Sequence, residues 1–337
     1  MSGDADLRAP RPFVVVWRVL TGCNQGCGFC AYDRGLPGAR VSVPAAAVLR
    51  LGRLLAEWSR RQGRLVLLSL LGGEPLLWPP LAEVLPALAD QGLQLSLTSN
   101  GSRLERPEVR ALLAATLTEL TLSIDGPAEV HDRLRGTPGA HARLLAAIDA
   151  FVALPKRPRL RVNTVLMQST VRHYGRLVAE LSARGVDAFS WNLLGGRDRP
   201  EFEAAERLTP RQLGRGLRVL DWVVERLPPG VVLEGGGAYR ERQFERLRGW
   251  PRPVEDCGPG QDFVFIDERG RLGPCHFTLD RHALGIESLV TPDDLDQLST
   301  RLGRRRARHP DPTCADCPST QVFDKFEPLR SVQEAPP

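Results

Sequence analysis

The chain has 337 residues, 42% of them hydrophobic, and a formal net charge of +5 at neutral pH. This length and composition exclude a disordered chain and fit one large domain, or one large domain with a smaller appendage. Nearly all of the basic residues are arginines, since lysine occurs only at Lys156 and Lys325, and they are scattered among acids with a single local run at 304–306. We therefore expect no nucleic-acid partner.

The N-terminus and the cysteines indicate the compartment. The first ten residues lack the basic start and the apolar core of a secretory signal, and no apolar run approaches the roughly eighteen residues that a membrane span needs. We expect a cytoplasmic protein with no membrane partner. Seven cysteines in such a chain favour metal chemistry over disulfides, and they divide into a group of three and a group of four.

Strand-like and helix-like segments alternate along the first two thirds of the chain. The β-branched run at 13–20 is typical of a buried strand, and the apolar spacing at 43–61 is typical of a helix. The further predicted strands are 65–71, 93–98, 119–124, 159–167 and 188–194, and the further helices are 80–90, 108–115, 140–153, 171–184 and 209–227. Six β-then-α units predict a parallel sheet with right-handed crossovers, curled or closed as a barrel.

Three cysteines follow the first strand at spacing C-x3-C-x2-C, namely Cys23, Cys27 and Cys30. Three thiolates can hold a [4Fe–4S] cluster and leave one iron without a protein ligand, whereas a closed zinc site requires four ligands. The run TGCNQGCGFCAY resembles the cluster loop of the radical S-adenosylmethionine (SAM) superfamily, including the aromatic Phe29 before its last cysteine. This resemblance implies that SAM chelates the open iron. It also implies that one electron, from a donor such as flavodoxin or ferredoxin, cleaves SAM to a 5′-deoxyadenosyl radical.

Polar motifs follow the next three strands, at the edge where enzymes with parallel sheets bind their ligands. The first motif, Gly72-Gly73-Glu74-Pro75, resembles the GGEP motif of the superfamily, in which backbone groups and the glutamate hold the amino group of SAM. An ordinary Gly-Pro turn is the alternative. The later motifs are Thr98 to Gly101, which contains Ser99 and Asn100, and Ser123 to Gly126, which contains Asp125.

The stretch SIDGPAEVHDRLRG at 123–136 resembles the same region of anaerobic sulfatase-maturating enzymes and their SPASM-containing relatives. By that resemblance Ser123 and Asp125 contact the ribose of SAM, and Arg135 pairs with its carboxylate. Asn163 and Leu193 match residues around the ribose and adenine only weakly, and they fit packing positions equally well.

The remaining four cysteines lie in the last third of the chain, at Cys257, Cys275, Cys314 and Cys317. Their pattern resembles the Twitch form of the SPASM extension, which carries one auxiliary [4Fe–4S] cluster, and a structural zinc ion on four thiolates is the alternative. The expected fold is therefore an α/β partial TIM-type (β/α)6 barrel with a small Twitch-like domain. The predicted divisions are a tail at 1–12, the barrel at 13–230, the auxiliary domain at 231–325 and a tail at 326–337.

The resemblance implies a radical enzyme, an oxidoreductase or lyase, that removes a hydrogen atom from a substrate carbon. An electron carrier without catalysis would leave the GGEP and SIDG motifs without a purpose. We predict a small natural-product substrate of sugar, cyclitol or nucleoside type, as in antibiotic pathways, with dehydrogenation, decarboxylation or a change in a C–C bond as the outcome.

The alternative is a maturase of ribosomal peptides or sulfatase-like proteins. Only about two dozen residues precede Cys27, too few for a leader-binding domain, which favours the small molecule. Candidate substrate-facing residues are Arg197 and Asp198 after the sixth strand. Further candidates are Glu234, Tyr239 and Arg240 in the glycine-rich connection that we expect to form a lid over the barrel mouth. Solvated loop residues are the alternative for each.

Overall fold

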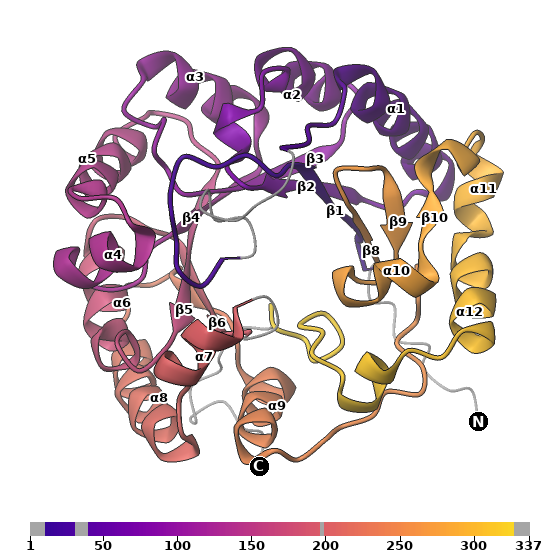
Figure 1. The fold of residues 1–337 in the computed structure, drawn as a ribbon. Helices are drawn as coiled ribbons and strands as arrows, with labels where there is room; N and C mark the ends of the chain where they lie inside the picture. The colour runs from indigo at the N-terminus through magenta and orange to yellow at the C-terminus, as the bar shows by residue number, and fades with distance from the viewer. Residues whose placement is uncertain (1–10, 31–39, 196–198, 327–337) are drawn as a thin grey trace, which may run out of the picture.

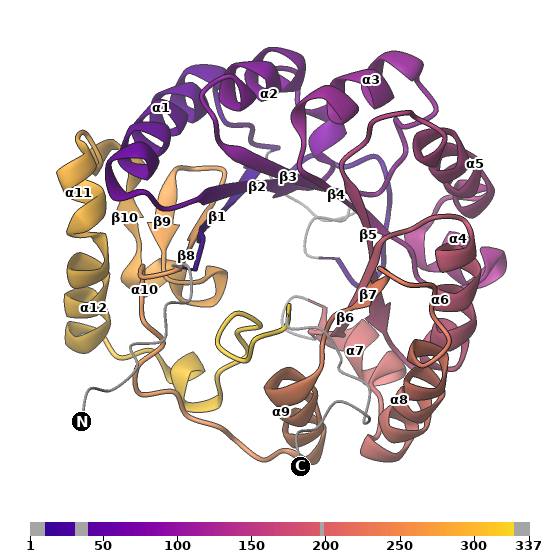
Figure 2. The ribbon, with the colours of Figure 1, turned by 180° about the vertical axis from the view of Figure 1, so that it is seen from behind.

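The computed structural model describes residues 11–30, 40–195 and 199–326. Its centre is one ten-stranded sheet in the order β10-β9-β8-β1-β2-β3-β4-β5-β6-β7. The sheet curls so that most helices form an outer ring, and the segment after α12 turns inward toward the middle of the ring (Figure 1). The reverse view shows the same ring, with α11 beside α1 and α12 next to α11 (Figure 2). The predicted α/β partial barrel is confirmed.

The six predicted strands are all present within two residues of their expected ends. They are β1 (Phe13–Leu20), β2 (Val66–Gly72), β3 (Gln94–Ser99), β4 (Glu119–Ser123), β5 (Arg159–Leu166) and β6 (Ala188–Leu193). Each pairs in parallel with the next one along the chain, and a short β7 (Val232–Leu233) adds to β6 in the same direction. The carboxyl ends of β1 to β6 therefore meet at one edge of the curled sheet.

Helices cover the outer face of this sheet. The predicted ones are α1 (Ala45–Gln62), α2 (Leu81–Ala89), α3 (Pro107–Thr116), α5 (Ala140–Val152), α6 (Tyr174–Ala183) and α8 (Pro210–Val224). In α1 the buried residues recur at helical spacing through Leu51, Leu55 and Trp58. Three helices between residues 128 and 248 were not predicted, namely α4 (Ala128–Arg135), α7 (Pro200–Glu206) and α9 (Gly237–Arg248).

The two faces of the strands differ in polarity. On β5, Leu160, Val162 and Leu166 are fully buried against the helices, while the alternate residues are only partly buried. Those alternate residues include Arg161 and Asn163, which lie on the inner side of the curled sheet because side chains of a strand point to opposite faces. The inner side of this strand is therefore polar.

The C-terminal third extends the same sheet. β8 (Phe263–Ile266) pairs in parallel with β1, and β9 (Arg271–Gly273) and β10 (Leu284–Gly285) continue it with antiparallel pairs. The short helices of this region are α10 (Leu279–His282), α11 (Pro292–Asp296) and α12 (Leu298–Arg308). Hydrogen bonding between strands thus continues past position 230, and the domain boundary placed there stays a prediction.

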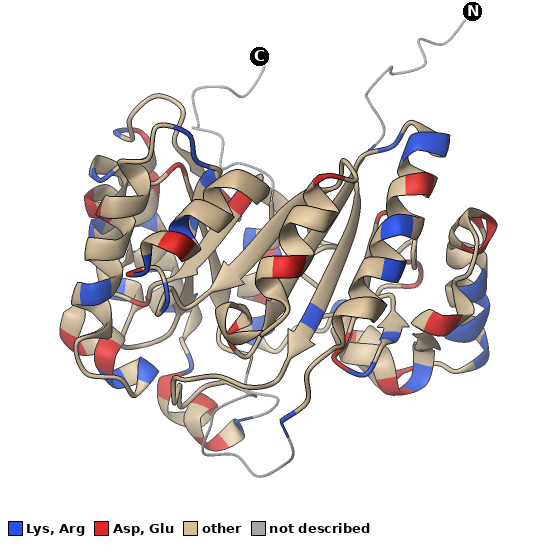
Figure 3. Ribbon diagram, turned by 90° about the horizontal axis from the view of Figure 1, so that it is seen from above, with Lys and Arg blue, Asp and Glu red and all other residues tan. Residues whose placement is uncertain are grey.

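Charges on the helices are mixed in sign. Bands of Lys and Arg alternate with bands of Asp and Glu along the ribbon (Figure 3). Among the described residues, none of the helices has the length and the apolar content to cross a bilayer.

Candidate active site

The loop after β1 carries the first three cysteines. Burial raises the pKa of the Cys27 thiol to about 11, and the neighbouring Cys30 and Cys23 add to this rise. The pKa of Cys23 is also raised, first by burial and then by Glu74 and Cys30. The three thiols of the motif are therefore close enough to act on one another's charge, which is the arrangement that a shared iron–sulfur cluster requires.

Backbone hydrogen bonds fix this loop to the GGEP segment. The amide of Gly73 donates to the carbonyl oxygen of Leu20 at 2.8 Å, and the amide of Glu74 donates to that of Gly22 at 2.8 Å. A Cβ on Gly72 would lie 2.5 Å from the Leu20 oxygen, and one on Gly73 would lie 2.1 Å from the Gly22 oxygen. Both glycines are therefore required because two backbones approach closely.

The Glu74 carboxylate joins the second motif to the third. It is fully buried, and one oxygen accepts hydrogen bonds from Ser99 Oγ at 2.7 Å and the Leu76 amide at 2.9 Å. Its other oxygen accepts from the Asn100 amide at 2.7 Å. Burial raises the pKa of Glu74, and the hydrogen bonds from Asn100 and Ser99 oppose that rise. Three of the roughly four acceptor positions of this carboxylate are thus occupied by the chain itself.

Asn100 connects the TSNG motif directly to the cysteine loop. Its side-chain nitrogen lies 3.0 Å from Asn24 Oδ1 and 3.7 Å from Cys23 Sγ, and its oxygen accepts from the Ser102 amide at 2.9 Å. The structure therefore brings the predicted residues of the TSNG motif and of the cysteine motif together, with Glu74 between them.

A buried ion pair reaches the same loop from the other side. Asp125 is fully buried and accepts hydrogen bonds from Arg135 Nε at 2.8 Å and from the Val165 amide at 2.9 Å. Arg135 Nη1 also lies 3.9 Å from Cys27 Sγ, and its guanidinium lies 5.4 Å from the centre of the Phe29 ring. Burial opposes the charge of Arg135, but Asp125 and Cys27 outweigh that effect and raise its pKa. This cation stabilises the thiolate that a cluster needs at Cys27.

His131 belongs to this arrangement although sequence analysis did not select it. Its Nδ1 accepts the Asp125 amide at 3.2 Å, so the histidine supports the turn that carries the aspartate. Burial and the nearby Arg135 lower the pKa of His131 to about 4, which keeps the ring neutral near pH 7. Ser123, by contrast, ends β4 on the inner side and is only partly buried.

The second cysteine group gathers around one cavity. Cys257, Cys275, Cys314 and Cys317 all line a cavity of about 630 Å³ between β8 and the last described segment. Burial raises the pKa of Cys257 to about 11, Arg306 opposes the rise, and the other three thiols add to it. The pKa of Cys317 is raised by burial and then by Cys275 and Cys314. The fold thus brings together four cysteines that are spread over positions 257 to 317.

Neither cysteine group matches a single-ion site. Among residues 11–30, 40–195 and 199–326, no group of three or more Cys, His, Asp or Glu side chains converges tightly enough to hold one metal ion. Thiolates around a cubane are spread over a larger inorganic core than four thiolates around one zinc ion. Both donor sets consist of cysteines alone, and thiolates are the ligands that hold such clusters in proteins.

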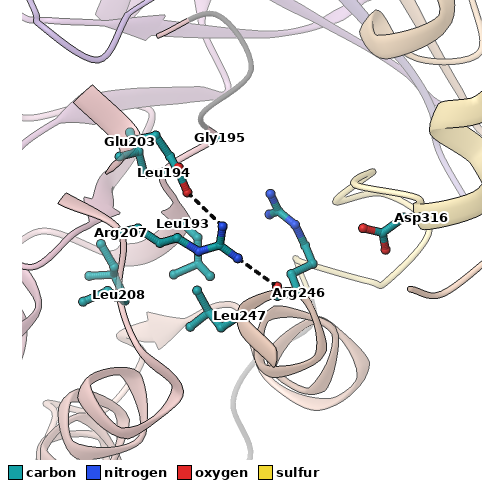
Figure 4. Close-up of a pocket in the computed structure, with 10 residues that line it drawn as sticks. Leu193, Leu194, Gly195, Glu203, Arg207, Leu208, Arg246, Leu247 and Asp316 are labelled. Atoms are coloured by element: carbon teal, nitrogen blue, oxygen red, sulfur yellow. Dashed lines mark hydrogen bonds and ion pairs between the residues drawn. The ribbon is translucent and has the colours of Figure 1, made fainter. Parts of the chain in front are cut away.

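A smaller cavity of about 220 Å³ opens at the ends of β5 and β6. The apolar residues that line it are Leu166, Leu193, Leu194, Leu208 and Leu247. Figure 4 shows the side chain of Arg207, from the segment after α7, and that of Arg246, from α9, beside this space. Arg207 pairs with Glu203 at 3.5 Å, and burial lowers the pKa of Arg246. Leu193, the weakly matched adenine position, therefore lies beside open space at the strand ends.

The prediction of a lid is wrong for Glu234, Tyr239 and Arg240. Glu234 is buried and accepts from Arg161 at 2.9 Å, and Tyr239 is buried with its hydroxyl donating to the Trp191 carbonyl oxygen at 3.1 Å. Arg240 pairs with an aspartate of α8 at 2.7 Å. The glycine-rich connection forms β7 and the start of α9, so these side chains stabilise the wall of the barrel. Arg197 and Asp198 lie outside the described residues.

Comparison with known proteins identifies the class. The family model of the radical SAM superfamily matches residues 17–174. A protein named AdoMet-dependent heme synthase from Methanosarcina barkeri is 35% identical over 287 residues, which are 79% of this chain and 77% of that protein. The chain belongs to the radical SAM superfamily, and it is an enzyme that uses a [4Fe–4S] cluster and SAM.

Two further similarities cover nearly the whole chain. The mycofactocin maturase MftC of Mycobacterium ulcerans is 25% identical over 295 residues, 85% of this chain and 74% of that protein. A crystal structure of Streptococcus suis SuiB bound to its precursor peptide SuiA has a TM-score of 0.66 at 19% identity, and it covers 94% of this chain and 71% of that chain. The second similarity concerns the fold, which therefore extends through the cysteine-rich end.

Proposed function

We propose that this radical SAM enzyme is a maturase that modifies a peptide substrate. The observation that carries the proposal is the match to the maturase MftC over 85% of the chain. For the predicted sugar, cyclitol or nucleoside substrate, the similarity to a GTP 3′,8-cyclase of Synechococcus reaches 33% identity but covers only 48% of this chain. The fold shared with SuiB, a protein that binds a precursor peptide, agrees with the same choice.

The residues in and around the first cysteine loop have different roles at the proposed SAM site. Cys23, Cys27 and Cys30 would hold a [4Fe–4S] cluster with one open iron, and SAM bound there supplies a carbon radical that removes a hydrogen atom from the substrate. Arg135 opposes the rise that burial causes in the pKa of Cys27 and so favours its thiolate, and Asp125 holds Arg135 in place. Glu74 fixes the GGEP and TSNG segments to one another.

The hydrogen bonds within the chain indicate which groups remain to bind SAM. Because chain donors already occupy most of the Glu74 carboxylate, we assign the binding of the SAM ammonium mainly to the backbone of Gly72 and Gly73. Ser123, which is partly open to the inner side, is the hydroxyl left for the ribose. Arg135 reaches both the cysteine loop and the strand ends, where the SAM carboxylate would lie.

We assign a second [4Fe–4S] cluster to Cys257, Cys275, Cys314 and Cys317. The cavity that all four cysteines line, and the effect of the other three thiols on the pKa of Cys257, support one shared cluster at this place. With all four irons ligated, this cluster would transfer electrons rather than bind substrate.

The test begins with iron content and SAM cleavage. After anaerobic reconstitution we expect about eight irons per chain, about four in the variant with Cys23, Cys27 and Cys30 changed to Ala, and 5′-deoxyadenosine from wild type only. Synthetic peptides encoded by short reading frames next to the gene are then added, with scrambled peptides as controls. The proposal requires a peptide that accelerates 5′-deoxyadenosine formation and changes in mass. Acceleration by heme precursors alone would overturn it.

A second candidate is a step of heme formation. It is favoured by the 35% identity to the M. barkeri heme synthase, which is higher than the identity to MftC. The same assay decides between the two, because heme precursors and peptides are offered to one enzyme preparation and only one class should couple to SAM cleavage.

A further inference from the structure

Lys325 is a buried lysine on the inner side of the sheet. The segment after Cys317 turns toward the middle of the ring (Figure 1), and Lys325 is only 6% exposed. Its Nζ donates to Asn163 Oδ1 at 3.2 Å and to Asn192 Oδ1 at 2.9 Å. These asparagines lie on β5 and β6, and Asn163 is in register with Ser123 of β4. The amine therefore lies beside the strand ends at which the ribose of SAM is expected.

A local turn directs this side chain inward. Asp324 has a φ of 50°, and the amide of Lys325 closes the turn on the Thr320 carbonyl oxygen at 3.1 Å. Asp324 pairs with Arg11 at 3.7 Å. The acid that precedes Lys325 in the chain is thus engaged elsewhere.

The ammonium has no carboxylate partner in the described part of the chain. Its neighbours there include two amide oxygens and the Phe326 ring, whose centre is 5.3 Å away. The facing charges are Arg161 of β5, which repels it, and Glu234, which is already bound to Arg161 at 2.9 Å. Burial and Arg161 lower the pKa of Lys325 to about 7. A buried cation in these surroundings is stabilised when an anion joins it.

We propose that Lys325 binds a carboxylate of the substrate. This inference rests on the proposed function, since it names the substrate group that the barrel receives. The two asparagine oxygens orient two of the three ammonium protons, which leaves the third for an incoming oxygen. Lys325 also lines the cavity of about 630 Å³ that the second cysteine group borders, so the bound group would lie on the side of the barrel that faces this group. A peptide and a heme precursor both carry carboxylates.

The Lys325 site can be tested directly because the chain contains only two lysines. Lys156 is the only other lysine, and it is exposed, so a holoenzyme grown with ¹³Cε-lysine gives two signals that the Lys325→Arg and Lys156→Arg variants assign. The probe is glutarate, a dicarboxylate, and glutaramide is its neutral control. Glutarate should raise the pKa of Lys325 by at least about one pH unit, while glutaramide leaves it unchanged. The same titration curve with both compounds overturns the proposal.

A binding measurement covers the case in which the resonance is broadened by a cluster. In equilibrium dialysis of radiolabelled glutarate against the holoenzyme, Lys325→Gln should bind at least about tenfold more weakly than wild type, and Lys156→Gln should match wild type. Equal binding by all three chains contradicts the site. Reductive SAM cleavage by the same wild-type preparation tests the proposed function separately. Cleavage without a glutarate effect overturns the Lys325 site alone, whereas no cleavage overturns the proposed function.

Discussion

The contact between Gly73 and the cysteine loop gives the sharpest prediction. In Gly73→Ala the new Cβ would lie 2.1 Å from the Gly22 carbonyl oxygen and 2.6 Å from that of Thr21. Ordinary contacts begin at 3.4 Å, so the two backbones must separate by about 1 Å. Both neighbours are backbone atoms that cannot rotate away. The hydrogen bonds of 2.8 Å between the segments, from Gly73 and Glu74, weaken with that separation.

The expected loss is larger in catalysis than in stability. Overpacking of this kind costs about 1–3 kcal/mol of unfolding free energy. A displacement of about 1 Å at a reacting centre costs on the order of 100-fold in rate. We therefore expect Gly73→Ala to form 5′-deoxyadenosine about 100-fold more slowly than wild type in an anaerobic assay with dithionite, and to lose only a small part of its resistance to urea.

A matched glycine serves as the control. A Cβ added at Gly214 of α8 would have no neighbour closer than 3.8 Å, so Gly214→Ala should keep the wild-type rate and gain up to about 1 kcal/mol from helix propensity. If Gly73→Ala cleaves SAM within about twofold of wild type at equal iron content, the two loops are not locked by this contact and the geometric reasoning is refuted.

Three further predictions concern the buried polar groups. Glu74→Gln places an amide among three donors and should lower the unfolding free energy by about 1–3 kcal/mol in urea titrations, while the exposed Glu83→Gln should not. Arg135→Gln leaves a buried aspartate unpaired and should lower the unfolding free energy by about 3–5 kcal/mol. It should also lower the iron content of reconstituted chains, and Arg133→Gln, at an exposed neighbour, is the control. His131 has a folded pKa of about 4 against 6.5 unfolded, so the unfolded state binds more protons below pH 6.5 and wild type should lose stability as the pH falls from 6.5 to 5. His131→Phe should show a flatter dependence, and equal slopes for both chains would contradict the buried neutral ring.

Short-range patterns predicted most of the barrel. The run Phe13–Leu20 is a strand at its predicted ends, because a segment of only eight residues that is rich in β-branched side chains favours a strand over a helix. The motifs after β2, β3 and β4 come together as expected, since parallel strands bring their carboxyl ends to one edge. α4 was missed because it is one of the shorter helices, between Pro127 and the left-handed Gly136, where a sequence pattern indicates a turn.

Long-range contacts account for what was missed. The segment at 234–240 contains three consecutive glycines, which indicate a loop, yet Tyr239 is buried against Trp191 and the chain becomes helical at Gly237. Lys325 lies 162 positions from Asn163 in the chain, and no local pattern marks a lysine that will be buried. Arg135 was selected by the family resemblance, but its approach to Cys27, 108 positions away, was not. Tertiary packing alone reveals these contacts.

The pairing of β8 with β1 has a consequence for the assembly of the enzyme in the cell. The strand that leads into the first cysteine loop is held on one side by β2 and on the other by residues 263–266, some 250 positions later in synthesis. Such distant contacts form late, because a long loop must close before they stabilise the fold. We expect nascent chains halted before residue 263 to take up little iron, and loading to begin only after release from the ribosome. Iron retention by ribosome-bound chains of increasing length would measure this order.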